Sequence, residues 1–423
     1  MKVLHVTQGY SPAIGGTEWM IQRLSEELVA QFGDQVTVFT TNCYSGEAFF
    51  TPRLPRLPLG SEEINGVRVR RFPVRSRVSQ IFRILQTIPY TFRLPGNQYL
   101  RALASGPVVP GLVAAIREHD ADVIAASSFP LLHMFAALRA AQETDRPCIL
   151  IGGLHPQDQW GFERPMIYQA IQQAARYVAY TEFEARYVIE RGALPERVAT
   201  IGVGVDPRPF ENLSTCEAKK RLGMDPDKPV IGFIGQIGGA KGVDTVVRAM
   251  PYVWENFPEA QLFIAGARTL FADYLEGLIK RLPPDDRAKI VLRYNFSHDE
   301  KPWLFAATDV FAYPSGYESF GIAFLEAWSC QKPVIGCQRG AVPWVVDAGR
   351  DGLLVEFQND KSLAEAIILL LANHQWSSAL GRAGYEKVKS GYTWSKISRR
   401  FRDQYLIALK ERKLDERFEK VYQ

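Results

Sequence analysis

A glycine-rich loop with one lysine is the first part of this sequence whose residue types could do chemistry. Residues 235–242 read Gly-Gln-Ile-Gly-Gly-Ala-Lys-Gly and lie between an apolar run and a helical pattern. Free backbone N–H groups at a helix start, together with a lysine, suit a phosphate group. The loop lacks the Gly-Lys-Ser/Thr of a Walker A motif. We predict phosphate binding at Lys241; the alternative is an ordinary connection between a strand and a helix.

Two glutamates, Glu318 and Glu326, form the most informative pattern. Glu318 precedes a predicted helix over 319–329. Ser319 can cap this helix, so that the N–H groups of Phe320 and Gly321 face outward from its first turn. Gly321 would also let a ligand approach the backbone.

Glu326 falls among apolar residues of that helix, where a carboxylate is costly unless it is hydrogen-bonded. A vicinal diol can donate two hydrogen bonds to one carboxylate. Glu326 is therefore a candidate ligand of a ribose; the alternative is a surface glutamate at a helix edge.

His155 follows an apolar strand pattern that ends near residue 151. Ligands of open α/β sheets bind at the carboxyl ends of strands, and histidine exchanges protons near neutral pH. We predict an active-site role for His155; the alternative is a structural histidine in a loop.

Strand and helix patterns alternate in a way that positions these residues. The first forty residues read as a strand, a turn-rich loop, a helix with Thr17 as its N-cap, and a second strand. The alternation breaks at 43–110, resumes, and starts again near 229. It predicts an α/β fold with parallel sheets covered by helices on both faces.

The segment 203–228 is rich in proline, glycine and aspartate, as linkers are. We therefore predict an N-terminal Rossmann-like domain over 1–206, with a basic insertion at 43–110, and a C-terminal donor-binding domain over 207–423. The last helices are expected to pack back on the first domain. Two such domains facing each other would leave a cleft for a small molecule.

Composition narrows the class of protein. A net charge of +4 over 423 residues argues against a nucleic-acid partner. Five scattered cysteines indicate isolated thiols in a reducing compartment and no zinc site. We find neither a signal peptide nor an apolar run long enough to cross a bilayer, so we expect a cytoplasmic protein.

The segment 52–101 holds ten arginines and two acids, a local net charge of +8. One hypothesis is contact with an anionic acceptor or with the inner face of a membrane, where Phe82, Ile84, Leu85 and Ile88 beside Arg83 would add a shallow apolar anchor. The alternative is a solvated insertion with ordinary surface charge.

Together these motifs resemble the retaining glycosyltransferases of the GT-B fold, known as group 1 or family 4. Glu318, seven residues and Glu326, with Ser-Phe-Gly after the first glutamate, match that family's E-x7-E motif. The stretch 230–250 matches its strand, glycine loop, Lys-Gly and helix. Weaker matches are Gly15-Gly16-Thr17-Glu18, the joining segment 180–210 and the strand at 349–355.

The resemblance implies a role for each matching position. Glu326 would hold the nucleotide ribose, and Glu318 with the backbone of Ser319, Phe320 and Gly321 the donor sugar and diphosphate. The diphosphate would also contact Gln236, Lys241 and, from the N-terminal side, Gly16. His155 would lie in the active site, and the nucleobase near Gly266, Arg293 and 294–296. As catalytic residues we thus expect His155, Glu318 and Lys241.

Two positions depart from the family pattern. Gln236 stands where an arginine is usual, and Trp344 where a glutamate is usual. Glutamine donates a hydrogen bond without charge, so Lys241 is expected to supply the local positive charge alone. Either change could alter the choice of donor.

The expected reaction transfers a hexose-type sugar from a UDP- or GDP-linked donor to a hydroxyl of a lipid-linked, polysaccharide or small-molecule acceptor. No Asp-x-Asp metal motif is evident, so we expect neither a metal nor another cofactor. Two alternatives stay open: a sugar-nucleotide epimerase, and a weakly catalytic or non-catalytic protein that binds sugar nucleotides. An NAD oxidoreductase is disfavoured because neither glycine loop reads G-x-G-x-x-G.

Overall fold

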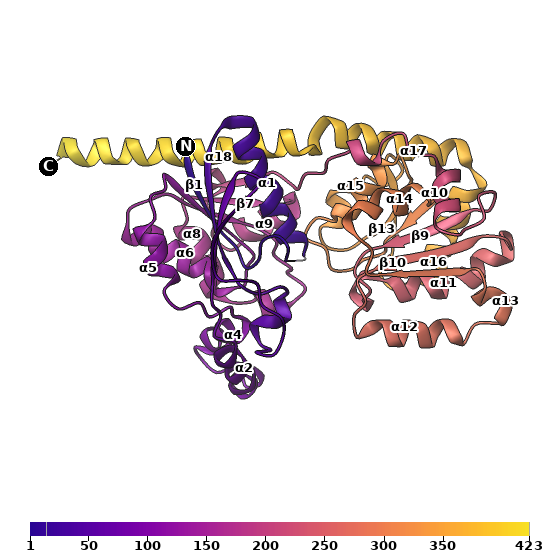
Figure 1. Cartoon of the computed structure of the whole chain (residues 1–423), viewed down its shortest axis with the longest axis horizontal. Helices are drawn as coiled ribbons and strands as arrows, with labels where there is room; N and C mark the ends of the chain where they lie inside the picture. The colour runs from indigo at the N-terminus through magenta and orange to yellow at the C-terminus, as the bar shows by residue number, and fades with distance from the viewer. Residues whose placement is uncertain (14, 423) are drawn as a thin grey trace. The chain divides into compact units, whose positions relative to one another are not determined.

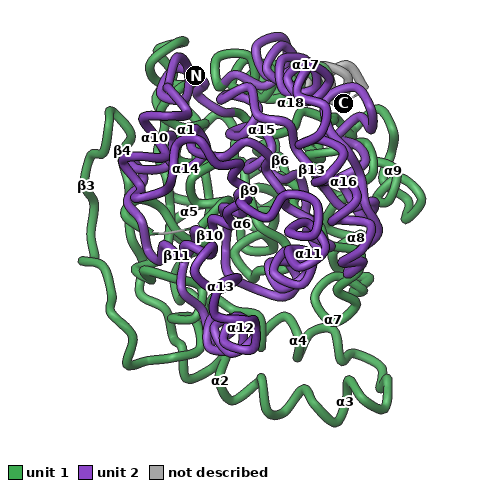
Figure 2. The backbone as a smooth tube through the Cα atoms, turned by 90° about the vertical axis from the view of Figure 1, so that its right-hand side faces the viewer, with its two compact units in different colours: residues 1–204, 394–423 green, residues 205–393 purple. Residues whose placement is uncertain are grey.

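The chain divides into two compact units, which we describe separately (Figure 2). Unit 1 comprises 1–204 and 394–423, and unit 2 comprises 205–393. The computed structural model describes residues 1–13 and 15–422, with side chains described up to residue 414. The division at 204/205 lies two residues from the boundary that we placed at 206/207, and the chain after 393 belongs to unit 1.

Unit 1 contains an eight-stranded sheet with the strand order β3-β4-β2-β1-β5-β6-β7-β8. All neighbours pair in parallel except β3 and β4. The strands are β1 (Lys2–Val6), β2 (Gln35–Thr41), β3 (Gly60–Ile64), β4 (Val67–Phe72), β5 (Val123–Ser127), β6 (Cys148–Ile151), β7 (Arg176–Ala179) and β8 (Val198–Thr200).

The helices of unit 1 comprise those that cover its sheet and a group at one end of the unit (Figure 1). They are α1 (Gly16–Phe32), α2 (Ser76–Leu85), α3 (Thr87–Thr91), α4 (Asn97–Ser105), α5 (Leu112–Glu118), α6 (Leu132–Glu143), α7 (Gln159–Phe162), α8 (Pro165–Gln173), α9 (Glu182–Ile189) and α18 (Trp394–Tyr422). The expectation that Thr17 caps α1 is wrong. The helix begins at Gly16, so its N-cap is Gly15, two residues before Thr17, and no side chain caps it.

A buried polar cluster joins the sheet of unit 1 to two of its helices. The ring of His5 on β1 contacts Ser25 Oγ on α1 at 2.7 Å and Tyr405 OH on α18 at 3.0 Å. Because burial lowers the pKa of His5 to about 3, the ring is neutral at physiological pH. These bonds tie the returning C-terminal helix to the strand at the centre of the sheet.

Unit 2 contains a six-stranded, fully parallel sheet with the order β11-β10-β9-β12-β13-β14. The strands are β9 (Val230–Ile234), β10 (Gln261–Gly266), β11 (Ile290–Tyr294), β12 (Val310–Ala312), β13 (Val334–Cys337) and β14 (Gly352–Val355). β9, β12 and β13 are buried throughout, as expected for strands with helices on both faces.

The helices of unit 2 are α10 (Thr215–Arg221), α11 (Val243–Asn256), α12 (Phe271–Lys280), α13 (Pro284–Arg287), α14 (Lys301–Ala306), α15 (Ile322–Ser329), α16 (Asp360–Ala372) and α17 (His374–Lys387). The predicted α/β class with two parallel-sheet domains is confirmed. No helix in the described part of the chain is long and apolar enough to cross a membrane.

Candidate functional site

Two loops meet at one edge of the sheet in unit 2. All strands of a parallel sheet end on the same side, so the loop after β9 and the loop after β12 come together there. The carbonyl of Ala240 accepts hydrogen bonds from Gly316 N at 3.0 Å and from Ser315 Oγ at 3.3 Å. The two segments that carry Lys241 and Glu318 are therefore held side by side.

Lys241 and Glu318 form an ion pair at this edge. Lys241 Nζ lies 2.6 Å from Glu318 Oε1 and also donates to the carbonyl of Tyr317 at 3.1 Å. The side chains of Lys241 and Glu318 are 21% and 11% exposed. Burial, and then the Glu318 carboxylate, raise the pKa of Tyr313 well above its usual value. In this structure the charge of Lys241 is thus balanced by a carboxylate, and an entering anion would compete with Glu318 for it.

Arg339 lies over the ring of Tyr317, the residue before Glu318, and the sequence analysis missed it. It follows β13, and its guanidinium carbon lies 5.1 Å from the ring centre of Tyr317 and 4.9 Å from that of Phe357. Tyr317 is adjacent in sequence to Glu318, which makes Arg339 a candidate second cation; that Lys241 alone supplies positive charge here stays a prediction. The one available signal was that Arg339 follows a predicted strand.

Glu326 is buried on α15, with 4% of its surface exposed. Lys301 on α14 donates from Nζ to Glu326 Oε1. The burial of Glu326 excludes the alternative of a surface glutamate at a helix edge, and a lysine 25 residues earlier in the chain compensates its charge. This contact is tertiary, and no local pattern reveals it.

The segment 319–321 differs from the prediction. Helix α15 begins at Ile322, not at 319, and its N-cap is Gly321 with φ 96° and no side-chain cap. Ser319 therefore does not cap the helix, and the open N–H groups of the first turn shift to Ile322 and Ala323. The Phe320 ring is buried, 5.5 Å from the ring of Tyr392, which leaves only its backbone for a ligand.

The remaining predicted residues of unit 2 have simpler surroundings. Gln236 is exposed on the loop after β9. Gly266 at the end of β10 is buried, and a Cβ there would lie 1.8 Å from the carbonyl oxygen of Gly235. Packing alone thus requires glycine at 266, and its contact with a donor stays a prediction. Trp344 is 42% exposed.

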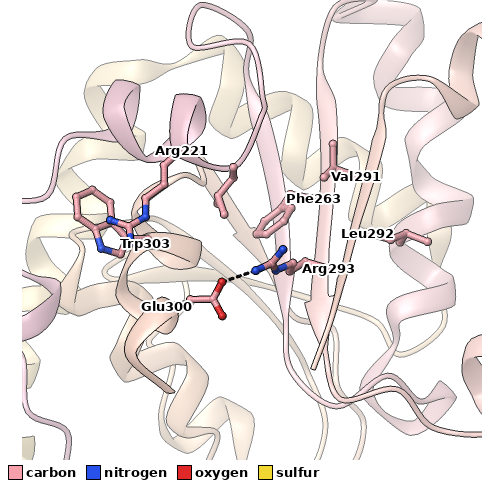
Figure 3. Close-up of a pocket in the computed structure, with 8 residues that line it drawn as sticks. Arg221, Phe263, Val291, Leu292, Arg293, Glu300 and Trp303 are labelled. Atoms are coloured by element: carbon pink, nitrogen blue, oxygen red, sulfur yellow. Dashed lines mark hydrogen bonds and ion pairs between the residues drawn. The ribbon is translucent and has the colours of Figure 1, made fainter. Parts of the chain in front are cut away.

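A separate cavity of unit 2 lies between β10, β11, α10 and α14 (Figure 3). Arg293 points toward Glu300 in this cavity and forms an ion pair with it. Arg221 lies over the Trp303 ring at 4.7 Å. We expected Arg293 near the nucleobase; the cavity contains none of the residues predicted for the diphosphate or the ribose.

Gly16 in unit 1 is exposed at the first turn of α1, where nothing would obstruct a side chain. Glu18 in the same turn accepts a hydrogen bond from Gln8 Nε2 at 3.1 Å, and burial raises its pKa. A Cβ on Gly15 would lie 2.0 Å from Glu18 Oε2. In the Gly-Gly-x-Glu sequence, the Glu18 carboxylate therefore lies against Gly15, while Gly16 begins the helix and stays exposed.

His155 lies in the loop after β6, also at the carboxyl edge of its sheet. Its ring packs edge-on against Phe162 at 5.6 Å. The structure places His155 and Gly16 in unit 1 and the other predicted residues in unit 2. Among the described residues no three His, Cys, Asp or Glu side chains are grouped to hold a metal ion, and metal-independent transfer stays a prediction.

Glu184 supports the His155 loop, and the sequence analysis missed it. Glu184 Oε1 accepts hydrogen bonds from the backbone N–H groups of Gly153 and Leu154, at 2.8 and 2.9 Å, and from Tyr177 OH at 2.7 Å. Its other oxygen accepts from Tyr180 N at 2.9 Å. Burial raises the pKa of this carboxyl group. Glu184 is thus a positioning residue for the loop that carries His155.

Glu184→Gln is expected to lower the free energy of unfolding of unit 1 by about 1–3 kcal/mol, because the amide NH2 cannot accept where a carboxylate oxygen did. Urea unfolding measures this change. Glu182→Gln is the matched control on the same helix, since Glu182 is exposed and pairs with Arg186; we expect less than about 0.5 kcal/mol there. Equal effects of the two substitutions would contradict the role of Glu184.

Family comparisons agree with this geometry. The model described as "Glycosyl transferases group 1" matches 215–387, and the model described as "Glycosyl transferase 4-like domain" matches 15–204. The chain belongs to the group 1 glycosyltransferases. Nearly all of unit 2 and of the sheet-bearing part of unit 1 lie within the two matched ranges, including every predicted site residue.

Named relatives in this family are partial matches. A D-inositol 3-phosphate glycosyltransferase of Thermobifida fusca is 28% identical over 239 residues, which are 52% of each chain. Its counterpart in Mycobacterium bovis is 33% identical over 48% of this chain and 42% of that one. The chain spans about half the length of these curated relatives.

Solved structures show the GT-B fold. A sucrose-phosphate synthase from Thermosynechococcus elongatus superimposes with a TM-score of 0.74 and 20% identity, over 97% of this chain and 100% of that one. HepE from Anabaena, solved with UDP and glucose, superimposes with a TM-score of 0.71 and 17% identity, over 95% and 98%. The predicted fold is thereby confirmed.

Proposed function

We propose that this protein is a retaining glycosyltransferase that moves a hexose-type sugar from a UDP- or GDP-linked donor to an acceptor hydroxyl. The observation that carries the proposal is the Lys241–Glu318 pair beside the start of helix α11 in unit 2. A cation and a helix N-terminus together suit a departing diphosphate. A half-buried cation at this edge also needs an anion, which Glu318 supplies when no donor is bound.

Each of the predicted residues has a proposed task. Lys241 stabilises the negative charge that grows on the leaving diphosphate. Glu326 accepts hydrogen bonds from the ribose, which does not react, and so contributes affinity rather than rate. His155 hydrogen-bonds the sugar or the diphosphate, while the acceptor proton passes to the departing phosphate oxygen. No step of this proposal uses a metal or another cofactor.

The acceptor is proposed to be lipid-linked, polysaccharide or a small molecule, met at the cytoplasmic face of a membrane. The names of the relatives add D-inositol 3-phosphate, a phosphorylated polyol, to the acceptors worth testing. Because these relatives match only about half of this chain, D-inositol 3-phosphate is one candidate acceptor among those proposed.

Incubation with UDP- and GDP-hexoses tests the proposal. We expect nucleotide release that depends on an acceptor, supplied as a lipid-linked sugar, an oligosaccharide or D-inositol 3-phosphate. Retention is read from the anomeric configuration of the product by NMR. An isomerised donor would identify an epimerase instead, and donor binding without turnover would identify a non-catalytic binding protein.

A further inference from the structure

Helices α2, α3 and α4 of unit 1 present an apolar face to solvent. Seven large apolar or aromatic side chains of these helices and of the turn between α3 and α4 are between 45% and 73% exposed: Ile81, Ile84, Leu85, Ile88, Phe92, Leu94 and Tyr99. Ile81, Ile84 and Leu85 recur at helical spacing on α2, so they share one face of that helix. Figures 1 and 2 both show these helices at one end of unit 1, away from its sheet. Soluble surfaces rarely gather so many large apolar side chains without a partner.

The charges around this face have one sign. Arg77 and Arg83 on α2 are exposed, and so is Arg93 in the turn between α3 and α4. No acidic residue occurs between Glu63 and Glu118. Exposed apolar side chains with arginines on the same stretch of chain complement the boundary between the headgroups and the acyl chains of an anionic bilayer.

Several arginines of the basic segment 52–101 are buried or in contact with other parts of unit 1, so the membrane hypothesis depends on the exposed residues of this face. Arg71 is buried on β4 and pairs with Glu62, and Arg101 is buried against backbone carbonyls. Arg70 lies over the rings of Phe39 and Phe72. Phe82, which we expected in the apolar anchor, is half-buried, whereas Ile81 and Phe92 are exposed.

A second copy of the chain fits this face poorly. A symmetric dimer brings the same patch of both copies together, and here it would set arginine against arginine with no carboxylate between them. An anionic lipid bilayer complements both the arginines and the apolar side chains, because its headgroups are negatively charged and its acyl chains are apolar.

The face is joined to the loop of His155. Trp160 on α7 donates from Nε1 to Gln86 Oε1, between α2 and α3, at 2.9 Å. Arg101 on α4 donates to the carbonyl of Trp160 at 2.9 Å. Two residues beyond Trp160, Phe162 packs on the His155 ring. A surface docked through these helices would therefore lie close to the part of unit 1 that carries His155.

We propose that the exposed face of α2, α3 and α4 docks on an anionic lipid bilayer. This inference rests on the proposed function in one respect: a docked bilayer would bring a membrane-bound acceptor close to His155. Vesicle binding itself requires no turnover, so the two proposals can fail independently.

Co-sedimentation of the full chain with vesicles tests the proposal. We expect binding to equimolar phosphatidylglycerol and phosphatidylcholine at about 50 mM NaCl, strong weakening at about 500 mM, and little binding to phosphatidylcholine alone. Replacing Arg77, Arg83 and Arg93 by glutamine should lower partitioning by about 100-fold. Ile84→Ser with Ile88→Ser should lower it by at least about 10-fold.

Matched controls lie on other surfaces. Arg197, Arg281 and Arg350 are exposed arginines, and Leu194 and Leu369 are exposed leucines of 46% and 48%. Replacing these arginines by glutamine or these leucines by serine should leave binding within about twofold. The proposal is overturned by absence of binding to the anionic vesicles at low salt, by equal loss in control and test variants, or by self-association of the wild type that Ile84→Ser abolishes. Vesicle binding without sugar transfer would contradict only the proposed enzyme.

Discussion

Lys241→Ala is expected to lower kcat/KM for sugar transfer by about 10²–10³-fold, the effect typical of losing one group that stabilises developing charge. Lys241 lies at the end of the loop that precedes α11 in unit 2, with its Nζ 2.6 Å from Glu318 Oε1. Its removal also leaves Glu318 as an uncompensated carboxylate where a diphosphate must bind. Initial rates of acceptor-dependent nucleotide release measure the effect.

Two variants accompany this substitution. Lys228→Ala removes a lysine of the same unit that pairs with Asp225 at 3.3 Å, and should change the rate by less than about twofold. Gln236→Arg places a charged donor on the same exposed loop and should retain or raise activity. If Lys241→Ala keeps more than a third of wild-type activity, the diphosphate is held elsewhere, and Arg339 becomes the first cation to test.

Glu326→Ala is expected to raise the donor KM by about 10–150-fold, with a much smaller effect on kcat at saturating donor. Losing a hydrogen bond to a charged group costs about 1.5–3 kcal/mol, and the ribose takes no part in the chemical step. The substitution also leaves Lys301 without its carboxylate. Donor titrations at fixed acceptor give both constants.

The control for this substitution is Glu365→Ala, an exposed glutamate on α16 of the same unit, which should leave both constants unchanged. Thermal unfolding of Glu326→Ala shows whether the loss of the Lys301 pair unfolds the unit. A folded Glu326→Ala variant with an unchanged donor KM contradicts the ribose assignment.

The buried strands were predictable because a short apolar run bounded by turn residues is typical of a buried strand. The apolar run that we expected to end near residue 151 is strand β6 (Cys148–Ile151). Strand β3 was missed because its Gly-Ser-Glu-Glu-Ile sequence is polar and exposed at the sheet edge, so burial leaves no pattern in it. The start of α15 was misplaced because Ser319 has the chemistry of a cap, while the backbone turns into the helix at Gly321.

The site was predictable as far as local motifs reach. The glycine loop and the two glutamates mark their positions by sequence spacing, and the structure brings Lys241 to Glu318 across 77 positions. Lys301, Arg339 and Glu184 were missed because each acts through a tertiary contact with a residue far along the chain. Such contacts depend on the order of strands in the sheet, and local sequence patterns do not predict that order.

Hydrogen–deuterium exchange with and without UDP or GDP tests the central claim most directly, because it locates the nucleotide without requiring the acceptor. We predict that one of these nucleotides slows exchange in 235–245 and 316–326, and that Glu326→Ala weakens this protection. Protection confined to the cavity of Arg221, Arg293 and Trp303, or absent from both segments with a nucleotide shown to bind, would contradict a donor site at the carboxyl edge of the unit 2 sheet.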